Sequence, residues 1–121
     1  MGEVRVLVVD DQEPFRQAIA AVVSETDGFV VMDSVESGEA SLAAVARSRP
    51  DLVLMDVNLP GIDGIEAARR IMLDVDPPVV VLLSTYDEDD VDFSGSGAAA
   101  YIAKAAFGPD RLTEAWTNAT A

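Results

Sequence analysis

The sequence predicts an α/β fold in which a doubly wound parallel sheet carries helices on both faces. Two observations lead to this prediction. Short apolar runs recur along the chain, and the segments between them carry apolar residues at helical spacing. Near-continuous apolar runs are typical of strands buried on both faces of a parallel sheet. Regular alternation of strand and helix with short connections is typical of the doubly wound class.

The predicted strands are short and rich in valine, leucine or alanine. They are residues 4–9, 29–32, 52–55 and 79–83, with a weaker run at 100–103. Their lengths fall within the usual range for strands in globular proteins. We therefore expect five strands.

Apolar stripes predict four clear helices. The stripes are Phe15, Ile19, Val22 and Val23; Leu42, Val45 and Ala46; Ile65, Ala68, Ile71 and Met72; and Leu112, Ala115, Trp116 and Ala119. Each places its apolar residues on one helical face. Pro14 and Pro109 stand where the first turn of a helix tolerates proline. We therefore expect a helix after each of the first three strands and another after the last.

The segment between the fourth and fifth strands is poorly helical. Val91 and Phe93 are two positions apart, which is not a helical spacing. Gly95 and Gly97 each cost about 1 kcal/mol relative to alanine inside a helix. The acidic run 87–90 suits a helix N-terminus. We expect only a turn or two of helix there, so the fourth helix of the fold is short or irregular.

Length and composition limit the classes of function. With 121 residues the chain is long enough for one domain, 1–121, and too short for two. Its net charge of −14 disfavours direct contact with nucleic acid or anionic membranes. The absence of cysteine and histidine excludes thiol and phosphohistidine chemistry on this chain. No apolar run is long enough for a signal peptide or a membrane span, which predicts a cytoplasmic protein.

Polar residues follow four of the five predicted strands. Asp10 and Asp11 follow the first strand, Asp56 the third, Ser84 and Thr85 the fourth, and Lys104 the fifth. Each alone has an ordinary explanation, such as a helix cap or a surface charge. Lys104, however, is the only lysine in the chain. Ligands bind at the carboxyl ends of strands in open α/β sheets, so the convergence of these residues there predicts one site.

The residue types at this predicted site favour phosphoryl chemistry. Three neighbouring carboxylates do not all ionise readily without a cation. Ligands that are all oxygen favour Mg²⁺, which takes one or two carboxylates together with phosphoryl oxygens. A lysine and a hydroxyl add a positive charge and a hydrogen-bond donor for a phosphoryl group. A carboxylate is itself a competent nucleophile that forms an aspartyl phosphate.

The chain resembles a response-regulator receiver domain of two-component signal transduction along nearly its whole length. The resemblance rests on VLVVDDQEPFR at 6–16, PDLVLMDVNLPGIDGIEA at 50–67, VVVLLSTYDEDD at 79–90 and GAAAYIAK at 97–104. LPGIDGIEA and STYDEDD are similar to receivers that precede a LuxR/NarL-like helix-turn-helix domain. The resemblance implies a flavodoxin-like sheet with strand order 2-1-3-4-5.

The resemblance also implies a role for each site residue. Asp56 would accept the phosphoryl group; Asp10, Asp11, Asp56 and the backbone carbonyl of Asn58 would bind Mg²⁺; Ser84 and Lys104 would contact the phosphate; and Thr85 and Tyr101 would form the switch. An ordinary aromatic residue on an edge strand is the other interpretation of Tyr101. The implied partners are a sensor histidine kinase and, after phosphorylation, a second copy of the chain. DNA would be bound through a C-terminal domain outside this chain, and the receiver itself would not be an enzyme.

The sequence leaves alternatives open. Lys104 follows Ser84 by 20 positions, a little fewer than in typical family members, and the shortening falls on the SGSG segment at 94–97. A pseudo-receiver that keeps the fold without phosphorylation is therefore one alternative. A haloacid-dehalogenase-like phosphatase is another, although it needs a second acid at the position of Asn58. A flavodoxin-like cofactor binder would need a glycine-rich phosphate loop, which the chain lacks.

Overall fold

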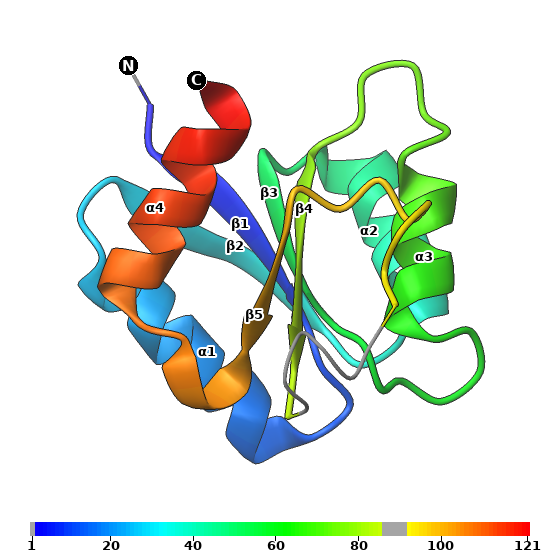
Figure 1. Ribbon diagram of the computed structural model, residues 1–121, viewed down its shortest axis with the longest axis horizontal. Coiled ribbons are helices and arrows are strands. Elements are labelled where there is room, and N and C mark those ends of the chain that lie inside the picture. The colour runs from blue at the N-terminus through cyan, green and yellow to red at the C-terminus, as the bar shows by residue number, and fades with distance from the viewer. Residues whose placement is uncertain (1, 86–91) are drawn as a thin grey trace.

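The computed structural model describes residues 2–85 and 92–121, which form a parallel sheet between two layers of helices (Figure 1). The strands are β1 (Val4–Val9), β2 (Phe29–Val35), β3 (Leu52–Asp56), β4 (Val79–Ser84) and β5 (Ala100–Ala103). The strand order is β2-β1-β3-β4-β5 and every pairing is parallel. The predicted fold class and strand order are confirmed.

Three strands extend further than their apolar runs predict. β2 continues to Val35, because its backbone still pairs with β1 where its side chains become polar, as at Asp33 and Ser34. β3 and β4 each gain one residue, Asp56 and Ser84. β3 and β4 therefore each end on a polar residue that is itself paired in the sheet. This pairing fixes the backbone of both residues at the carboxyl edge.

Helices cover both faces of the sheet. They are α1 (Glu13–Glu25), α2 (Gly38–Ser48), α3 (Gly64–Ile71) and α4 (Pro109–Thr120). Helices α1 and α4 lie on one face, and α2 and α3 lie on the other (Figure 1). Side chains alternate along each strand, so β3 sends Leu52 and Leu54 to the α1/α4 core and Val53 and Met55 to the α2/α3 core. The alternating burial explains why its whole run is apolar.

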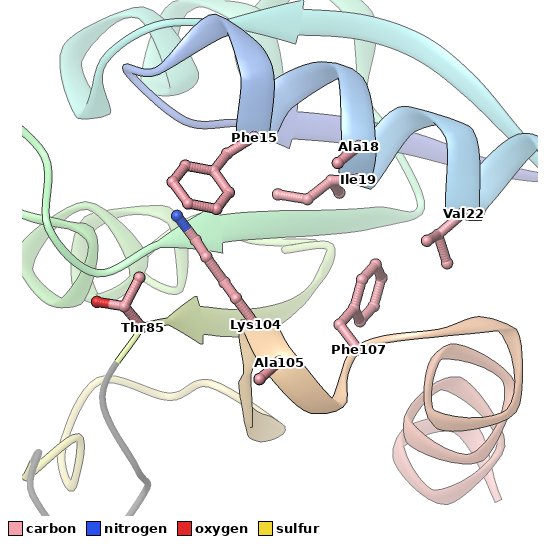
Figure 2. A pocket seen from close by; sticks show the side chains of 8 residues that line it. All are labelled: Phe15, Ala18, Ile19, Val22, Thr85, Lys104, Ala105 and Phe107. Atoms are coloured by element: carbon pink, nitrogen blue, oxygen red, sulfur yellow. The ribbon is translucent and has the colours of Figure 1, made fainter.

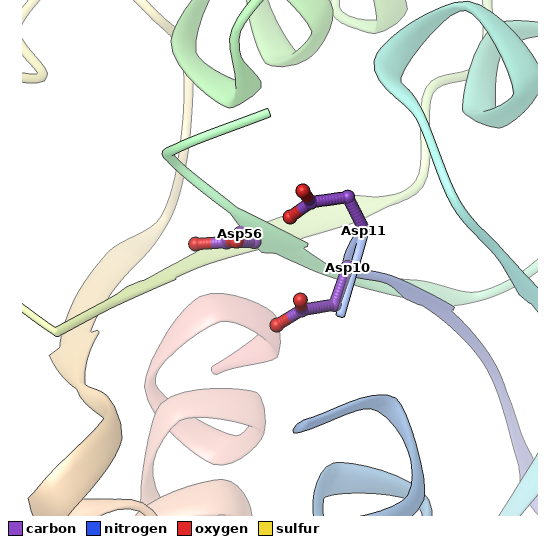
Figure 3. A group of neighbouring side chains, drawn as sticks. All are labelled: Asp10, Asp11 and Asp56. Atoms are coloured by element: carbon purple, nitrogen blue, oxygen red, sulfur yellow. The ribbon is translucent and has the colours of Figure 1, made fainter. Parts of the chain in front are cut away.

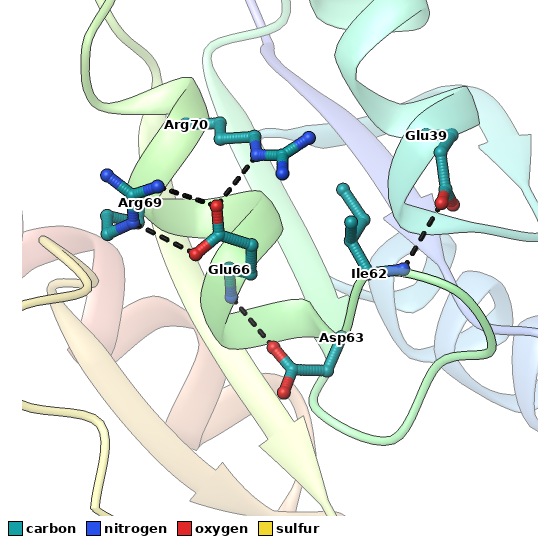
Figure 4. Close-up of polar contacts among 6 residues, drawn as sticks. All are labelled: Glu39, Ile62, Asp63, Glu66, Arg69 and Arg70. Atoms are coloured by element: carbon teal, nitrogen blue, oxygen red, sulfur yellow. Dashed lines mark hydrogen bonds and ion pairs between the residues drawn. The ribbon is translucent and has the colours of Figure 1, made fainter.

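The connection that follows Asp56 is anchored by side chains. Asp63 caps α3 by accepting a hydrogen bond from the Glu66 N–H at 2.8 Å. The carboxylate of Glu66 in turn contacts Arg69 and Arg70, and Glu39 of α2 accepts a hydrogen bond from the Ile62 N–H at 3.1 Å (Figure 4). These contacts fix the α3 end of the loop, and its first residue, Val57, is held by backbone hydrogen bonds with Leu83 and Gly64, each at 2.9 Å.

The segment before β5 is irregular where it is described. The predicted fourth helix falls mainly on residues 86–91, which lie outside the described residues. Residues 92–99 contain no helix and form a turn in which the Ser96 N–H donates to the carbonyl of Phe93 at 3.2 Å. The Phe93 ring stacks on Tyr101 with centroids 5.4 Å apart. This segment therefore packs against the α2/α3 core without helical structure.

The chain leaves β5 through a short 3-10 helix, Lys104–Ala106, before α4 begins. Both Pro14 and Pro109 lie in the first turn of their helices, as predicted. Within the described parts of the chain, no helix combines the length and apolar character needed to cross a bilayer.

Candidate functional site

The carboxyl ends of β1 and β3 bring three aspartates together (Figure 3). Val9 of β1 pairs with Met55 of β3, so the residues that follow, Asp10 and Asp56, lie side by side. Asp11 joins them, and one carboxylate oxygen from each of the three lies within 4.8 Å of the others. The parallel register of two central strands thus creates the acidic cluster that the sequence predicts.

Lys104 reaches this cluster from the end of β5. Its Nζ lies 2.7 Å from Asp10 Oδ2 and 3.5 Å from Asp56 Oδ2. Asp10 and Asp56 are 0% and 4% exposed, whereas Asp11 is exposed to solvent. One ammonium therefore contacts two buried carboxylates, and the third carboxylate faces water.

Backbone N–H groups engage the remaining oxygens of the buried pair. The Gln12 N–H donates to Asp10 Oδ1 at 2.9 Å, and the Asn58 N–H donates to Asp56 Oδ1 at 3.3 Å. Both buried side chains are therefore oriented by hydrogen bonds as well as by Lys104. This leaves Asp56 fixed at the edge of the sheet with an oxygen facing the lysine.

The buried surroundings shift the proton affinity of Asp56. Burial raises the pKa of its carboxyl from 3.8 to about 6, since a charged group loses hydration there. The nearby Lys104 charge lowers this pKa, and the charge of Asp10 raises it again. The lysine thus offsets only part of the cost of burying the Asp56 carboxylate. A cation added to the cluster would offset more of it.

The donor set fits a hard divalent cation. All three side chains offer carboxylate oxygens, which are the ligands that Mg²⁺ prefers. A cavity of about 80 Å³ adjoins Asp56, and its lining residues are Gln12, Phe15, Asp56, Asn58, Thr85 and Lys104. This volume exceeds the roughly 30 Å³ that one water molecule occupies in the liquid. The cavity therefore has room for a small group bonded to Asp56.

The other predicted residues lie at different depths. Thr85 is exposed and lines the cavity, as does Asn58, whose N–H contacts Asp56. Ser84 is fully buried at the end of β4, in register with Ala103 of β5. Tyr101 is also buried, two pairs earlier in the same ladder, and it packs in the α2/α3 core. The structure therefore gathers Asp56, Lys104, Asn58 and Thr85 around one cavity next to the other two aspartates, whereas Ser84 and Tyr101 are buried outside its lining.

Two residues of α1 at this site were not predicted as functional. The Phe15 ring faces the Lys104 ammonium, with Nζ 4.0 Å from the ring centroid (Figure 2). Arg16 donates to the backbone carbonyl of Asp10 at 2.9 Å. The sequence shows Phe15 only as one member of the helical stripe. Its position in the first turn after the Asp10–Asp11 pair is the signal that places it near the site.

Comparisons with known proteins agree with this arrangement. The family model of the response regulator receiver domain matches residues 6–117. Response regulator GacA of Pseudomonas syringae pv. syringae is 41% identical over 106 residues, which cover 85% of this chain and 49% of that protein. The positive alginate biosynthesis regulatory protein of Pseudomonas aeruginosa is 34% identical over 116 residues, or 95% of this chain and 46% of that protein.

A solved structure is similar over the whole fold. The signal receiver domain of the response regulator NarL from Mycobacterium tuberculosis superposes with a TM-score of 0.87 at 27% identity. The match covers 98% of this chain and 97% of that one. The chain thus spans about half the length of the curated relatives that it matches and nearly all of a solved receiver domain.

Proposed function

The chain belongs to the response regulator receiver family, and we propose that it acts as a phosphoacceptor switch in which Asp56 receives the phosphoryl group. One observation carries the proposal. Asp56 is a buried carboxylate at a strand end, it is 3.5 Å from a lysine ammonium, and it lines a small cavity beside two further aspartates.

In the proposed reaction a carboxylate oxygen of Asp56 attacks the phosphorus of the donor. The new bond to oxygen forms as the bond between phosphorus and the leaving atom of the donor breaks, which gives an aspartyl phosphate. A pKa of about 6 leaves Asp56 mostly ionised at neutral pH, as a nucleophile requires. We expect the donor to be a phosphohistidine of a sensor histidine kinase, as the family resemblance implies, since the given chain has no histidine of its own.

The surrounding residues position and neutralise charge, which is the main demand of phosphoryl transfer. Asp10, Asp11, Asp56 and the Asn58 carbonyl would hold Mg²⁺, which supplies positive charge next to the phosphoryl oxygens when bound. Lys104 contacts Asp56 directly and would transfer this contact to a phosphoryl oxygen. The hydroxyl of Ser84 would donate a hydrogen bond to another phosphoryl oxygen. Thr85, which lines the cavity, would then change its position as part of the switch.

The output of the switch is a further part of the proposal. Movement of Ser84 and Thr85 toward the phosphate would change the packing of Tyr101, on the neighbouring strand, and hence the surface around β4 and β5. We expect a homodimer to form through that surface after phosphorylation. We also expect a C-terminal DNA-binding domain to read the switch in the cytoplasm. The resemblance of LPGIDGIEA to LuxR-type regulators supports this expectation.

A pseudo-receiver remains the second candidate, because the described residues 92–99 form no helix on the face that would carry the output. Phosphorylation separates the two candidates. Intact mass after incubation with Mg²⁺ and acetyl phosphate should increase by one phosphoryl group in the native chain and not in Asp56→Asn. The matched control Asp74→Asn changes an exposed aspartate at the other end of the sheet and should keep the gain.

A gain in Asp56→Asn would assign the acceptor to a different residue. No gain in any of the three proteins, with native circular dichroism in each, would support the pseudo-receiver instead.

A further inference from the structure

Lys104 depends on a long, flexible side chain to reach the acidic cluster. A lysine stem has four carbons and loses considerable rotamer entropy, about 2 kcal/mol, when it is held in one conformation. Its side chain is nevertheless only 11% exposed, and its Nζ contacts Asp10 and Asp56. Some feature of the pocket must therefore restrict the stem as well as attract the charge.

The Phe15 ring provides this restriction. Lys104 Nζ lies 4.0 Å from the centroid of the ring, and Figure 2 shows the end of the lysine side chain next to it. A cation this close to an aromatic face is attracted by the negative potential of the ring. The attraction is stronger where water is excluded, as it largely is here.

The ring is itself held by the start of α1. Phe15 lies between Pro14, which restricts the first helical turn, and Arg16, whose guanidinium donates to the carbonyl of Asp10 at 2.9 Å. The first turn of the helix is thus attached to the strand end that carries the acidic pair. The backbone that carries the ring is fixed relative to the same residues that Lys104 must meet.

Phe15 borders two cavities, as Lys104 and Thr85 also do. It lines the cavity of about 80 Å³ at Asp56 and a larger cavity of about 350 Å³ between α1 and the segment after β5. The larger cavity is mainly apolar, with Ile19, Val22 and Phe107 among its lining residues (Figure 2). Loss of the ring would open space beside the lysine stem and would let it move away from Asp56.

We propose that Phe15 is a positioning residue for phosphoryl transfer, which holds the Lys104 ammonium between Asp10 and Asp56 so that it meets the incoming phosphoryl oxygens. The inference rests on the proposed function of the site. Phe15 contacts neither the donor nor the acceptor oxygen in this role, and it acts only through Lys104.

The first test is the rate of phosphoryl incorporation from acetyl phosphate with saturating Mg²⁺. Phe15→Leu keeps an apolar side chain but removes the aromatic face, and it should lower the rate roughly five- to thirtyfold, the range between an exposed and a desolvated cation–π contact. Phe15→Tyr keeps the face and should restore most of the rate. Phe107→Leu changes an aromatic residue of the same larger cavity and should leave the rate unchanged.

The second test needs neither metal nor donor. Because Lys104 is the only lysine, selective ¹³C-lysine labelling gives a single set of side-chain signals. The ring current of Phe15 should shift the protons next to the ammonium upfield in the native chain, in Phe15→Tyr and in Phe107→Leu. In Phe15→Leu these signals should move close to their random-coil positions.

Two results would overturn the proposal. One is an unchanged lysine spectrum or an unchanged rate in Phe15→Leu. The other is a rate in Phe15→Tyr as low as that in Phe15→Leu, with both proteins folded. Failure of the proposed function would look different, because the native chain itself would then take no phosphoryl group. The lysine signals would still be shifted by the ring in that case, but the positioning role in phosphoryl transfer would be wrong as well.

Discussion

Aspartates contact cationic side chains at both ends of the sheet, but in opposite surroundings. At the carboxyl end, Asp10 and Asp56 are buried and contact one ammonium, that of Lys104. At the amino end, Asp74 lies on the surface with Arg49 Nη1 at 2.8 Å from its Oδ2. Burial raises the pKa of Asp56 to about 6, whereas the hydrogen bond from Arg49 lowers the pKa of Asp74.

Polar groups at the amino end are matched with partners. The Arg5 guanidinium donates to the carbonyls of Ser48 and Arg49, at 2.7 and 3.1 Å. The Arg5 N–H donates to Asp51 Oδ2 at 2.9 Å, and the Arg49 guanidinium also donates to the carbonyl of Asp76 at 3.2 Å. These contacts join the loops that precede β3 and β4 to each other and to β1. All of them lie on the exposed edge, where each charge remains hydrated.

We interpret this as the difference between a structural edge and the edge that carries the proposed site. Exposed ion pairs contribute little to stability, and they also cost little to maintain. The buried carboxylate of Asp56, by contrast, carries a desolvation cost that the lysine does not fully offset. We infer that the carboxyl edge is less stable than it would be with neutral residues, and that ligand binding recovers the difference.

The largest expected effect is the loss of the buried cation. Lys104→Met keeps most of the stem but leaves Asp10 and Asp56 without their ammonium, and we expect the free energy of unfolding at pH 7 to fall by about 3–5 kcal/mol. The matched change at the other edge, Arg49→Met, should have a far smaller effect because its partner is exposed. Urea denaturation without Mg²⁺ measures both, and losses of equal size would remove the distinction between the two edges.

Backbone packing under Asp56 should give the next largest effect. A Cβ at Gly64 would overlap the carbonyl oxygen of Asp56 and lie 2.8 Å from its carbonyl carbon. Gly64→Ala should therefore cost about 2–3 kcal/mol of stability and should slow phosphorylation, because Asp56 must shift. Gly108→Ala, at the start of α4, is the control, since a Cβ there meets nothing within 4 Å. If Gly64→Ala kept the native free energy of unfolding and the native rate of phosphorylation, the backbone of Asp56 would tolerate displacement.

The charge of Asp56 should have a smaller effect, with a defined dependence on pH. Its pKa is higher in the folded chain, about 6, than the ordinary 3.8, so the folded chain holds a proton more strongly and loses stability as pH rises between these values. The shift corresponds to at most about 3 kcal/mol. This shift already includes the attraction of Lys104, so we expect Asp56→Asn to raise the free energy of unfolding at pH 7 without Mg²⁺ by no more than this amount.

This gain should vanish near pH 4, where Asp56 is protonated in the native chain. Urea denaturation at the two pH values measures it. The control at the exposed edge, Asp74→Asn, should lower the free energy of unfolding at pH 7. The pKa of Asp74 is lowered, so its ionised form is favoured in the folded chain. A gain from Asp56→Asn that is the same at both pH values would mean that burial of the charge is not its cause.

The fold was largely predictable, because burial on both faces makes the central strands apolar throughout. The run 52–55 predicts β3 for this reason, and the polar residue that follows it predicts the site. β2 was predicted too short, because its last residues, such as Asp33, pair through their backbone at an edge strand and show no apolar signal. The predicted fourth helix falls mainly on residues 86–91, outside the described part, and 92–99 agree with the poor helical pattern.

The acidic cluster was predictable from strand ends alone, but the environment of Lys104 was not. Its contact with Phe15 depends on how α1 crosses the sheet and on the 3-10 turn after β5, and local periodicity specifies neither. The different depths of Ser84 and Thr85 follow from the alternation of side chains at the end of β4. The sequence placed both at the edge without saying which one faces the cavity.

The most direct test of the account is the free energy of unfolding at pH 7 as a function of Mg²⁺ concentration, in the native chain and in Asp56→Asn. Without Mg²⁺ the native chain should be the less stable of the two. At ten times the dissociation constant, Mg²⁺ should add about 1.4 kcal/mol to the native chain and clearly less to Asp56→Asn, which lacks one ligand. An equal response in both proteins, or a native chain that is the more stable one without Mg²⁺, would contradict the account.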